Sequence, residues 1–252
     1  MIVETHVHLC DEKYDADRQE VLSRAAKAGV VKFLNVSAGL GEARKIAALE
    51  IEGVYKAFGL HPHNTGEFSR EVYAEIEGYF RAQKNAVAVG EIGLDYFRST
   101  TSKADQEKIF RKFLGLAVEL GLPVVIHSRE AHGDVIKILK EYALMKKGII
   151  HCFTGDAETA AQFTDMGFAL GIGGVVTFSN TGELAGAVRR TPLESIVLET
   201  DAPWLAPQPF RGKRNEPAYL KEIVKMIAGI KEVSAEEVEE ITAKTAGRIL
   251  NI

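Results

Sequence analysis

The first two histidines of the chain, His6 and His8, are separated by a single valine and close a short apolar stretch. Side chains two residues apart on a β-strand point to the same face. Two imidazoles on one face suit a divalent transition metal, since neutral imidazole is the commonest metal ligand near neutral pH. By itself the pair fits two hydrogen-bonded structural histidines equally well, so its meaning depends on the rest of the chain.

Histidines and carboxylates also stand at the ends of later apolar runs. They are His61, with His63 two residues further on, and Glu91, His127, His151 and Asp201. Any one of them could be a hydrogen-bonded core residue. A whole set of such residues is hard to explain as core packing. If the apolar runs are the strands of a parallel barrel, their carboxyl ends meet at one rim, so the set predicts one shared site.

Six of these residues are candidate metal ligands: His6, His8, Glu91, His127, His151 and Asp201. They are too many for one tetrahedral ion, and they suffice for two divalent ions, about 3.5–4 Å apart, that share a carboxylate. Glu91 is the natural bridge. The sequence order predicts that His6, His8 and Asp201 hold one metal, and that His127 and His151 hold the other.

This donor set suits Zn²⁺, Mn²⁺ or Fe²⁺ and does not exclude Mg²⁺. Two such ions can lower the pKa of water toward about 7 and clamp the attacking and leaving oxygens of a phosphoryl centre. Asp201 can ligate a metal and also accept a proton from that water, so it is the candidate general base. Glu91, as the bridge, is the second candidate catalytic residue.

Three cations in four residues, Arg211, Lys213 and Arg214, follow Asp201. Arginine can bind a phosphate through two hydrogen bonds, and lysine can pair with it as a point charge. A solvated surface loop is the alternative, and in isolation it is the better interpretation of such a run. The position of the run directly after Asp201 favours phosphate binding.

Other residues near the strand ends are weaker candidates for contact with a substrate. They are His61, His63 and Arg129. Arg98, which follows Tyr96 and Phe97, could position a nucleic-acid strand whose bases stack on these aromatic rings, although such rings more often serve in packing.

Short β-branched runs alternate with longer amphipathic stretches along the whole chain. The predicted strands are Ile2–Leu9, Lys32–Ala38, Val54–Leu60, Ala86–Leu94, Pro123–Ser128, Gly148–Phe153, Phe168–Gly173 and Ser195–Thr200. Several are almost wholly apolar, which is typical of strands buried on both faces. Eight strands that alternate with helices predict an α/β fold of the (β/α)8 TIM-barrel type, with a doubly wound open sheet as the alternative.

The helical patterns carry their own start and stop signals. The predicted helices include Asp17–Lys27, Asp105–Leu120, Ala157–Met166 and two in the tail, one to about Ala228 and one over Ala235–Leu250. Gly121 ends the second of these, and Ser234 with Glu237 forms a capping box for the last. Because no linker, repeat or low-complexity segment interrupts the pattern, residues 1–252 are expected to form one domain.

Composition limits the classes of function. Of the 252 residues, 46% are hydrophobic, which is enough for a sizeable core. The formal net charge of −4 gives no global basic field, so a nucleic-acid substrate would need a local basic patch. Cys10 and Cys152 make no disulfide framework. Without a signal peptide or an apolar run of ~20 residues, we expect a cytoplasmic protein with no membrane partner and no obligate protein partner.

Seven segments, spread over nearly the whole chain, carry a family resemblance. They are Thr-His-Val-His-Leu at 5–9, Gly-Leu-His-Pro-His at 59–63, Gly-Glu-Ile-Gly-Leu-Asp-Tyr at 90–96, Ile-His-Ser-Arg at 126–129, His-Cys-Phe-Thr-Gly at 151–155, Glu-Thr-Asp-Ala-Pro at 199–203 and Arg-Gly-Lys-Arg-Asn-Glu-Pro at 211–217. In this order they resemble the TatD family of metal-dependent deoxyribonucleases, within the amidohydrolase-like barrels. The resemblance implies a (β/α)8 barrel, a divalent metal centre at the six positions above, and hydrolysis of DNA, often as a 3′ to 5′ exonuclease on single strands or ends.

Two positions depart from the family pattern, which commonly has Asp where this chain has Glu4 and Cys10. Neither residue is a candidate ligand. Glu4 shares a strand face with His6 and could orient that histidine. Cys10 puts a role for a carboxylate at its position in doubt, unless Asp11 replaces it.

The same site leaves two other functions open. One is an amidohydrolase-type enzyme that hydrolyses a C–N or ester bond of a small molecule, for which a neutral or apolar pocket would serve better than the basic run at 211–214. The other is a non-catalytic barrel that binds a partner. The ligand set argues against this last function, because a buried cluster of this kind is costly without a metal.

Overall fold

The computed structural model describes residues 1–98, 100–142 and 148–252. Within these residues, eight parallel strands form one sheet in which each strand pairs with its neighbours in the chain. The strands are β1 (Ile2–Val7), β2 (Val30–Val36), β3 (Val54–Phe58), β4 (Ala86–Asp95), β5 (Val124–Arg129), β6 (Gly148–His151), β7 (Ala169–Ile172) and β8 (Ile196–Leu198). All eight predicted strands are therefore present.

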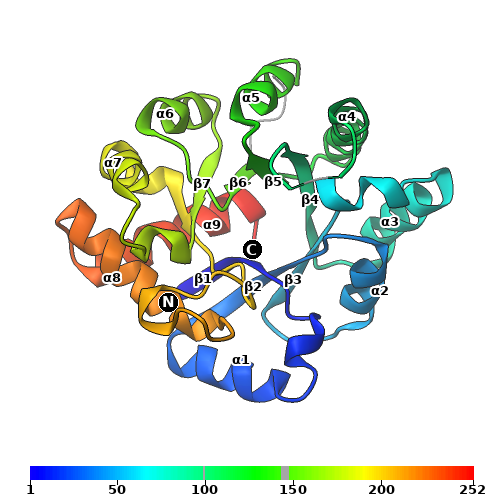
Figure 1. Ribbon diagram of the computed structural model, residues 1–252. Coiled ribbons are helices and arrows are strands. Elements are labelled where there is room, and N and C mark those ends of the chain that lie inside the picture. Colours follow the sequence, from blue (N-terminus) through cyan, green and yellow to red (C-terminus); the bar gives the residue numbers. More distant parts are fainter. Residues whose placement is uncertain (99, 143–147) are drawn as a thin grey trace.

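The sheet closes almost completely into a barrel (Figure 1). The backbone N–H of Asp201, just beyond β8, donates to the carbonyl of His6 in β1 at 3.0 Å, and the N–H of His8 donates to the carbonyl of Ala202 at 2.9 Å. These bonds join the first strand to the segment that follows the last. The (β/α)8 prediction is confirmed, and the open doubly wound alternative is wrong.

Helices follow the strands and surround the sheet (Figure 1). They are α1 (Arg18–Lys27), α2 (Leu40–Ala48), α3 (Arg70–Ala82), α4 (Lys103–Leu120), α5 (His132–Lys140), α6 (Ala157–Asp165), α7 (Gly182–Arg190), α8 (Leu220–Lys231) and α9 (Ala235–Leu250). The expected helices are all present. α8 continues past the expected end at Ala228, because Glu232 is the residue that adopts the left-handed conformation at its C-cap.

Local side-chain chemistry sets the ends of these helices. The Ser102 hydroxyl accepts a hydrogen bond from the Asp105 N–H at 3.1 Å at the start of α4, and Gly121 ends that helix in the left-handed region with φ 65°. Ser234 accepts from the Glu237 N–H at 3.1 Å at the start of α9, as the capping pattern predicts. The caps satisfy donors that a helix N-terminus otherwise leaves unpaired.

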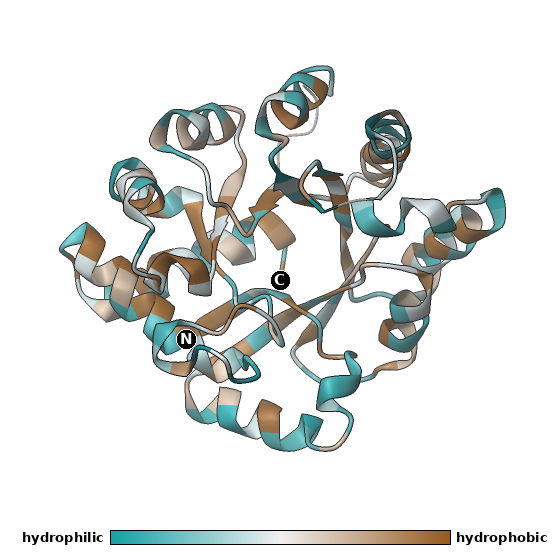
Figure 2. Ribbon diagram, viewed as in Figure 1, coloured by the Kyte–Doolittle hydropathy of each residue, from teal (hydrophilic) through white to brown (hydrophobic). Residues whose placement is uncertain are grey.

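Apolar side chains pack in two layers, one between strands and helices and one inside the barrel. The inner layer takes at least one residue from each strand, such as Val3 of β1 and Val197 of β8, and Ile249 and Leu250 at the end of α9 pack against it. The strands accordingly carry hydrophobic residues, while the surrounding helices mix hydrophilic and hydrophobic positions (Figure 2). α9 closes the end of the barrel opposite the carboxyl ends of the strands.

The strands β4 and β5 approach each other closely where they carry site residues. Gly93 has φ 144°, and a Cβ at this position would collide with the carbonyl oxygen of His127. Only glycine takes this conformation without strain.

None of the helices in the described residues is long and apolar enough to cross a membrane.

Candidate metal centre

The end of β1 and the segment after β8 bring three candidate ligands together. Nε2 of His6 lies 3.3 Å from Nε2 of His8. Oδ1 of Asp201 lies 3.9 Å from Nε2 of His6 and 3.5 Å from Nε2 of His8. The three side chains that the sequence assigned to one metal therefore converge on one point.

Glu91, in β4, faces this group with one carboxylate oxygen and other histidines with the second. Its Oε2 lies 3.4 Å from Nε2 of His6. Its Oε1 lies 2.8 Å from Nδ1 of His127 and 3.9 Å from Nε2 of His151. A carboxylate held between two sets of imidazoles has the geometry that a bridging ligand requires.

His151, at the end of β6, lies between the two sets. Its Nε2 is 3.9 Å from Oε1 of Glu91 and 3.7 Å from Oδ1 of Asp201. Its ring stacks on that of His6 with centroids 3.4 Å apart, whereas the His127 centroid is 6.4 Å away. The expected pairing of His151 with His127 is thus looser than the sequence order suggested, because the barrel brings β6 and β1 face to face across its interior.

The spacing and chemistry of these atoms fit divalent metal ions. Four ligands about 2.1 Å from a tetrahedral zinc ion lie roughly 3.4 Å from one another. The inward-facing nitrogen and oxygen atoms are 2.8–3.9 Å apart. The described residues contain three groups of possible ligands. The first is His6, His8 and Asp201, the second is His61, Glu91 and His127, and the third is His6, His151 and Glu199. Imidazole nitrogen and carboxylate oxygen are the donors that Zn²⁺ and Mn²⁺ accept.

His61 belongs to the second group by distance but presents a proton to it. The backbone N–H of His63 donates to Nδ1 of His61 at 3.0 Å, so Nδ1 carries no proton and the neutral ring is protonated at Nε2. Nε2 lies 3.6 Å from Oε1 of Glu91. Because a protonated ring nitrogen does not ligate a metal, His61 is suited to donate a hydrogen bond, in keeping with the substrate contact expected from the sequence.

Three site histidines have a carboxylate beside the ring nitrogen that faces away from the centre. The pairs are Glu42 of α2 with Nδ1 of His8 (3.0 Å), Asp95 of β4 with Nε2 of His127 (3.2 Å) and Glu199 with Nδ1 of His151 (2.9 Å). A carboxylate in this position holds the tautomer and the orientation of a metal-binding histidine and raises its basicity.

Glu199 also lies among polar atoms that lack partners. Its carboxylate lies close to Nδ1 of His151, but the two groups are not aligned as a hydrogen bond, so within the described residues this nitrogen has no hydrogen-bond partner. In the part of the chain that the structure describes, Oε2 of Glu199 and Nδ1 of His6 are also buried without a hydrogen-bond partner. Gly171 of β7 leaves room for the carboxylate, since a Cβ there would collide with it.

Sequence reasoning missed Glu42, Asp95 and Glu199 as parts of the site. Asp95 and Glu199 could have been found from their places in the Gly-Glu-Ile-Gly-Leu-Asp-Tyr and Glu-Thr-Asp-Ala-Pro segments. Glu42 lies on a helix and carried no such signal.

Burial opposes every charge in the centre, and the contacts decide the net direction. Burial raises the pKa of Glu91, but the imidazoles around it, His61 first, outweigh burial and hold that pKa well below its usual range. Burial likewise opposes ionisation of Asp201, yet the hydrogen bond from His8 and the nearby imidazoles lower its pKa. Burial lowers the pKa of His61 to about 3. Near neutral pH both carboxylates are therefore ionised and His61 is neutral.

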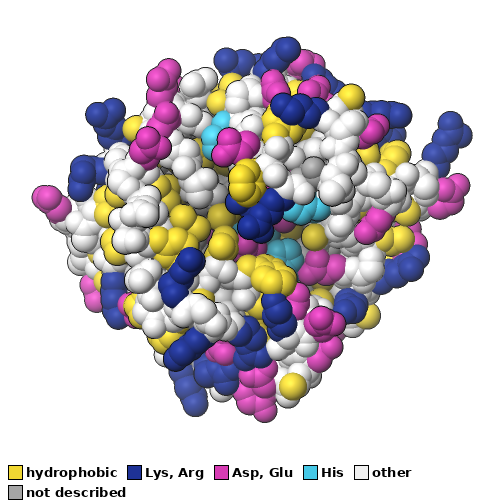
Figure 3. All heavy atoms as spheres, viewed as in Figure 1, with side chains coloured by type: hydrophobic (Ala, Val, Ile, Leu, Met, Phe, Trp, Pro, Cys, Tyr) yellow, Lys and Arg dark blue, Asp and Glu magenta, His cyan; other side chains and the backbone are white. Residues whose placement is uncertain are grey.

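A cleft of about 930 Å³ opens over the centre. Ligand pockets are typically about 300–1,000 Å³, so this cleft lies at the upper end. Figure 3 shows histidines in a hollow of this face, bordered by Lys, Arg and hydrophobic side chains. The cations Lys45, Arg98 and Arg129 line it, and His63, which pairs with Oδ2 of Asp95 at 2.8 Å, lines it as well. Arg129 and His63 therefore lie where a substrate would.

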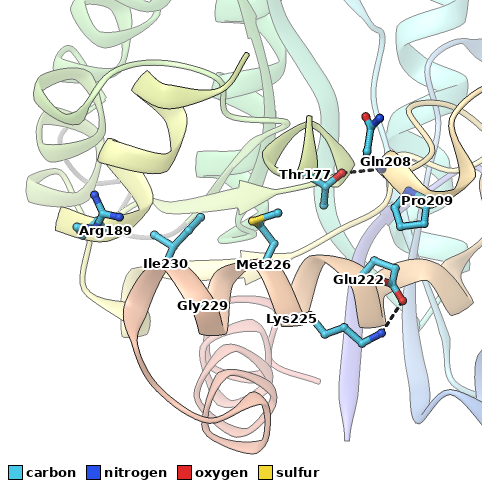
Figure 4. Close-up of a pocket in the computed structure, with 9 residues that line it drawn as sticks. All are labelled: Thr177, Arg189, Gln208, Pro209, Glu222, Lys225, Met226, Gly229 and Ile230. Atoms are coloured by element: carbon cyan, nitrogen blue, oxygen red, sulfur yellow. Dashed lines mark hydrogen bonds and ion pairs between the residues drawn. The ribbon is translucent and has the colours of Figure 1, made fainter. Parts of the chain in front are cut away.

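A second cavity, of about 460 Å³, lies against α8, beside α7 and the 3₁₀ helix η3 (Gly174–Thr177) (Figure 4). Lys225 pairs with Glu222 at 2.8 Å, and the Thr177 hydroxyl accepts from the Gln208 N–H at 2.8 Å. Among its described lining residues there is no histidine and no group of metal donors. The chemistry of this chain is therefore concentrated at the cleft.

The basic run after β8 lies outside the described lining of the cleft, where the sequence predicted that it would bind phosphate. None of Arg211, Lys213 and Arg214 is among the described residues that line the cleft. Arg214 donates to both carboxylate oxygens of Asp17 at 2.7 Å and to Glu216 at 3.0 Å, so its guanidinium ties this loop to the start of α1. The expectation that Arg214 meets phosphate is not supported, because these two carboxylates already take its donors.

Arg211 and Lys213 are exposed. The guanidinium of Arg211 lies 3.9 Å from the centroid of the Phe178 ring. A substrate would have to extend beyond the cleft to reach either side chain.

The two departures from the family pattern have distinct surroundings. Glu4 is fully buried, and its carboxylate accepts from the N–H of His6 at 3.1 Å, from the N–H of Thr200 at 2.9 Å and from the Thr200 hydroxyl at 2.6 Å. Burial raises its pKa to about 8. Glu4 therefore joins the backbones that carry His6 and Asp201. The thiol of Cys10 is 3.5 Å from the Asn35 amide nitrogen.

Comparison with known proteins shows which family the chain belongs to. The family model described as TatD related DNase matches residues 3–251. A metal-dependent hydrolase of Bacillus subtilis, YabD, is 40% identical over the whole of both chains. The 3′-5′ ssDNA/RNA exonuclease TatD of Cronobacter sakazakii is 34% identical over 96% of this chain and 95% of its own.

Among solved structures, the TatD homologue YJJV of Escherichia coli superposes with a TM-score of 0.95 at 28% identity, over 100% of this chain and 98% of its own. Both the superposition and the family match extend over the whole barrel, and so over every strand that contributes to the centre. The chain is a metal-dependent hydrolase of the TatD related DNase family.

Proposed function

We propose that this protein hydrolyses phosphodiester bonds of DNA and removes nucleotides from the 3′ end of a single strand. One observation carries the proposal: Glu91 stands with one oxygen at His6 and the other at His127, as a ligand shared by two metal ions would. The name of the Cronobacter sakazakii relative, a 3′-5′ ssDNA/RNA exonuclease, supports the choice of substrate.

The donor set divides into residues that hold metals and residues that act on the substrate. His6, His8, Glu91, His127, His151 and Asp201 would hold two divalent ions, with Zn²⁺, Mn²⁺ or Mg²⁺ as candidates. Bound there, the ions would lower the pKa of a water molecule toward about 7 and stabilise charge on the phosphoryl oxygens. Asp201 is ionised near neutral pH, so it can take the proton that this water loses.

His61 and Arg129 would position the scissile phosphate. Nε2–H of His61 points into the cleft beside Glu91, and burial keeps the ring neutral, so it can donate to a phosphoryl oxygen. Arg129 adds a positive charge on the wall formed by the end of β5. Removal of one such donor typically costs about 10²-fold or more in turnover.

Hydrolysis of a small-molecule C–N or ester bond is the competing function. It would use the same activated water, but a neutral substrate has no need of the three cations Lys45, Arg98 and Arg129 that line the cleft. The acidic Asp11 and Glu12 also line the cleft, so the preference for a phosphate-bearing substrate comes from the three cations themselves, which can pair with its phosphates.

Metal removal tests the proposal directly. Protein treated with a chelator and then dialysed should lose activity on a 5′-labelled single strand and regain it when Zn²⁺, Mn²⁺ or Mg²⁺ is added. A ladder that shortens from the 3′ end would show the polarity, and a duplex of the same sequence is the control for strand preference. Undiminished nuclease activity in the metal-depleted protein, or turnover of amide substrates alone, would overturn the proposal.

A further inference from the structure

We propose that Trp204 and Phe97 are two stacking platforms, on opposite sides of the cleft, that bind unpaired bases of a single-stranded nucleic acid. The inference rests on the proposed function and adds to it which part of the substrate these two side chains bind. It concerns bases, whereas the metal centre and the cations act on phosphates.

Both aromatic side chains are exposed where burial would be the normal outcome. Phe97 is 59% exposed and Trp204 is 46% exposed, and Leu205 beside Trp204 is 37% exposed. These three belong to the seven large hydrophobic side chains that are exposed in the described residues. Trp204 and Leu205 line the cleft, and Phe97 adjoins Arg98, which also lines it. Apolar surface gathered at one hollow marks a binding site more often than chance exposure does.

The two rings stand on opposite sides of the metal centre. Phe97 follows the end of β4 at Asp95, and Trp204 follows β8 and Asp201. In the described sheet the strands run in the order β1 to β8, so β4 and β8 are half a turn apart around the barrel. A strand that crosses the cleft from one ring to the other would pass over the candidate ligands.

Backbone hydrogen bonds hold each ring at a set place relative to the centre. Oδ1 of Asp95 accepts from the N–H groups of Phe97 and Arg98, each at 2.8 Å, while Oδ2 of the same carboxylate faces His63 and His127. The N–H of Trp204 donates to the carbonyl of Asp201 at 2.8 Å. Each platform is thus tied to a residue of the centre.

A cation lies over each ring. Nζ of Lys13 is 3.1 Å from the centroid of the Trp204 ring, and the guanidinium of Arg129 is 4.4 Å from that of Phe97. A cation over one face of an aromatic ring is attracted by its quadrupole. Because each ring remains about half exposed, a base can stack on the uncovered part while the neighbouring cation meets its phosphate. Aromatic rings interleaved with cations are the usual means of binding single strands without regard to sequence.

Trp204 is the only tryptophan of the sequence, so its fluorescence reports on this site alone. The probe is an oligothymidylate, with a strand of equal length in which every nucleotide is abasic as its control. The two strands carry the same phosphates, and only one carries bases. In metal-loaded protein with Asp201→Asn, which slows cleavage during the titration, we expect the thymidylate strand to quench the emission and the abasic strand to leave it unchanged.

Kinetics on the wild-type background test both rings. Trp204→Ala and Phe97→Ala should each raise KM for the thymidylate strand about tenfold, the effect of losing one base stack, with kcat unchanged. Trp204→Phe, which keeps an aromatic face, should restore most of the loss. Met226→Ala removes a hydrophobic side chain that is 36% exposed on α8, away from the cleft, and serves as the matched control. On the abasic strand all variants should equal wild type.

The results separate this inference from the proposed function. Equal quenching by both strands, or unchanged KM in both alanine variants, would overturn the stacking platforms even if the protein proves to be a nuclease. Wild-type protein that shows base-dependent quenching but hydrolyses neither strand would refute the proposed function and leave the platforms standing.

Discussion

The backbone N–H of His63 donates a hydrogen bond to Nδ1 of His61 at 3.0 Å. This bond fixes the proton of the neutral His61 ring on Nε2, which faces the cleft beside Glu91. His61 therefore stands close to the candidate ligands without being able to join them. The distinction between a ligand and a hydrogen-bond donor follows from one backbone contact that distance alone does not reveal.

His61→Ala should keep the metals and lose turnover. Because the ring contributes a donor and no ligand atom, we expect the metal content, measured by mass spectrometry of the purified protein, to match wild type. Loss of one donor to the phosphoryl group should lower kcat by about 10²-fold. His61→Asn, whose amide can still donate, should recover part of the activity. Loss of metal from the alanine variant would show that His61 is a ligand after all.

Glu199→Gln should weaken metal binding. The neutral amide cannot stabilise the proton on Nδ1 of His151 as a carboxylate does, so Nε2 becomes a poorer ligand. Loss of such a partner typically costs 10–100-fold in metal affinity, to be measured by competition with a chelator. Glu194→Gln makes the same chemical change at an exposed position before β8, at the other end of this strand, and is the control. Equal affinity of both variants would remove Glu199 from the centre.

Asp201→Asn should reduce catalysis far more than binding. The amide can still contact a metal but cannot accept the proton of the attacking water, and general-base catalysis contributes about 10²–10⁴-fold. Single-turnover rates should fall by that order, while binding of a labelled single strand, followed by fluorescence anisotropy, should change little. A parallel loss of affinity and rate would instead mean that Asp201 mainly holds the site together.

Arg214→Ala should destabilise the fold and spare the chemistry. Hydrogen bonds from Arg214 and Arg24 lower the pKa of Asp17 to about 2. A carboxylate whose pKa is lower in the folded chain adds stability above its unfolded pKa of about 4, and that stability is lost as the pH falls toward 2. The melting temperature should drop in the variant at pH 7, and the gap to wild type should narrow below pH 4.

The matched control for Arg214 is Lys213→Ala, the exposed neighbour, whose melting temperature should equal that of wild type. KM for single-stranded DNA should be unchanged in Arg214→Ala, since this guanidinium faces Asp17 and Glu216. A raised KM with an unchanged melting temperature would restore the phosphate role that the sequence suggested.

The sequence alone determined the barrel and the ring of polar residues at its rim. Apolar runs and amphipathic stretches are local patterns, and parallel strands place their carboxyl ends on one side, so His6, Glu91, His127, His151 and Asp201 could be expected to meet. Only the tertiary structure decided which atom of each side chain faces which neighbour. Two contacts illustrate this: Glu42 lies behind His8, and Arg214 binds Asp17 instead of facing the cleft. Both contacts join segments that are far apart in the chain. Such contacts form when the barrel closes, and no local periodicity encodes them.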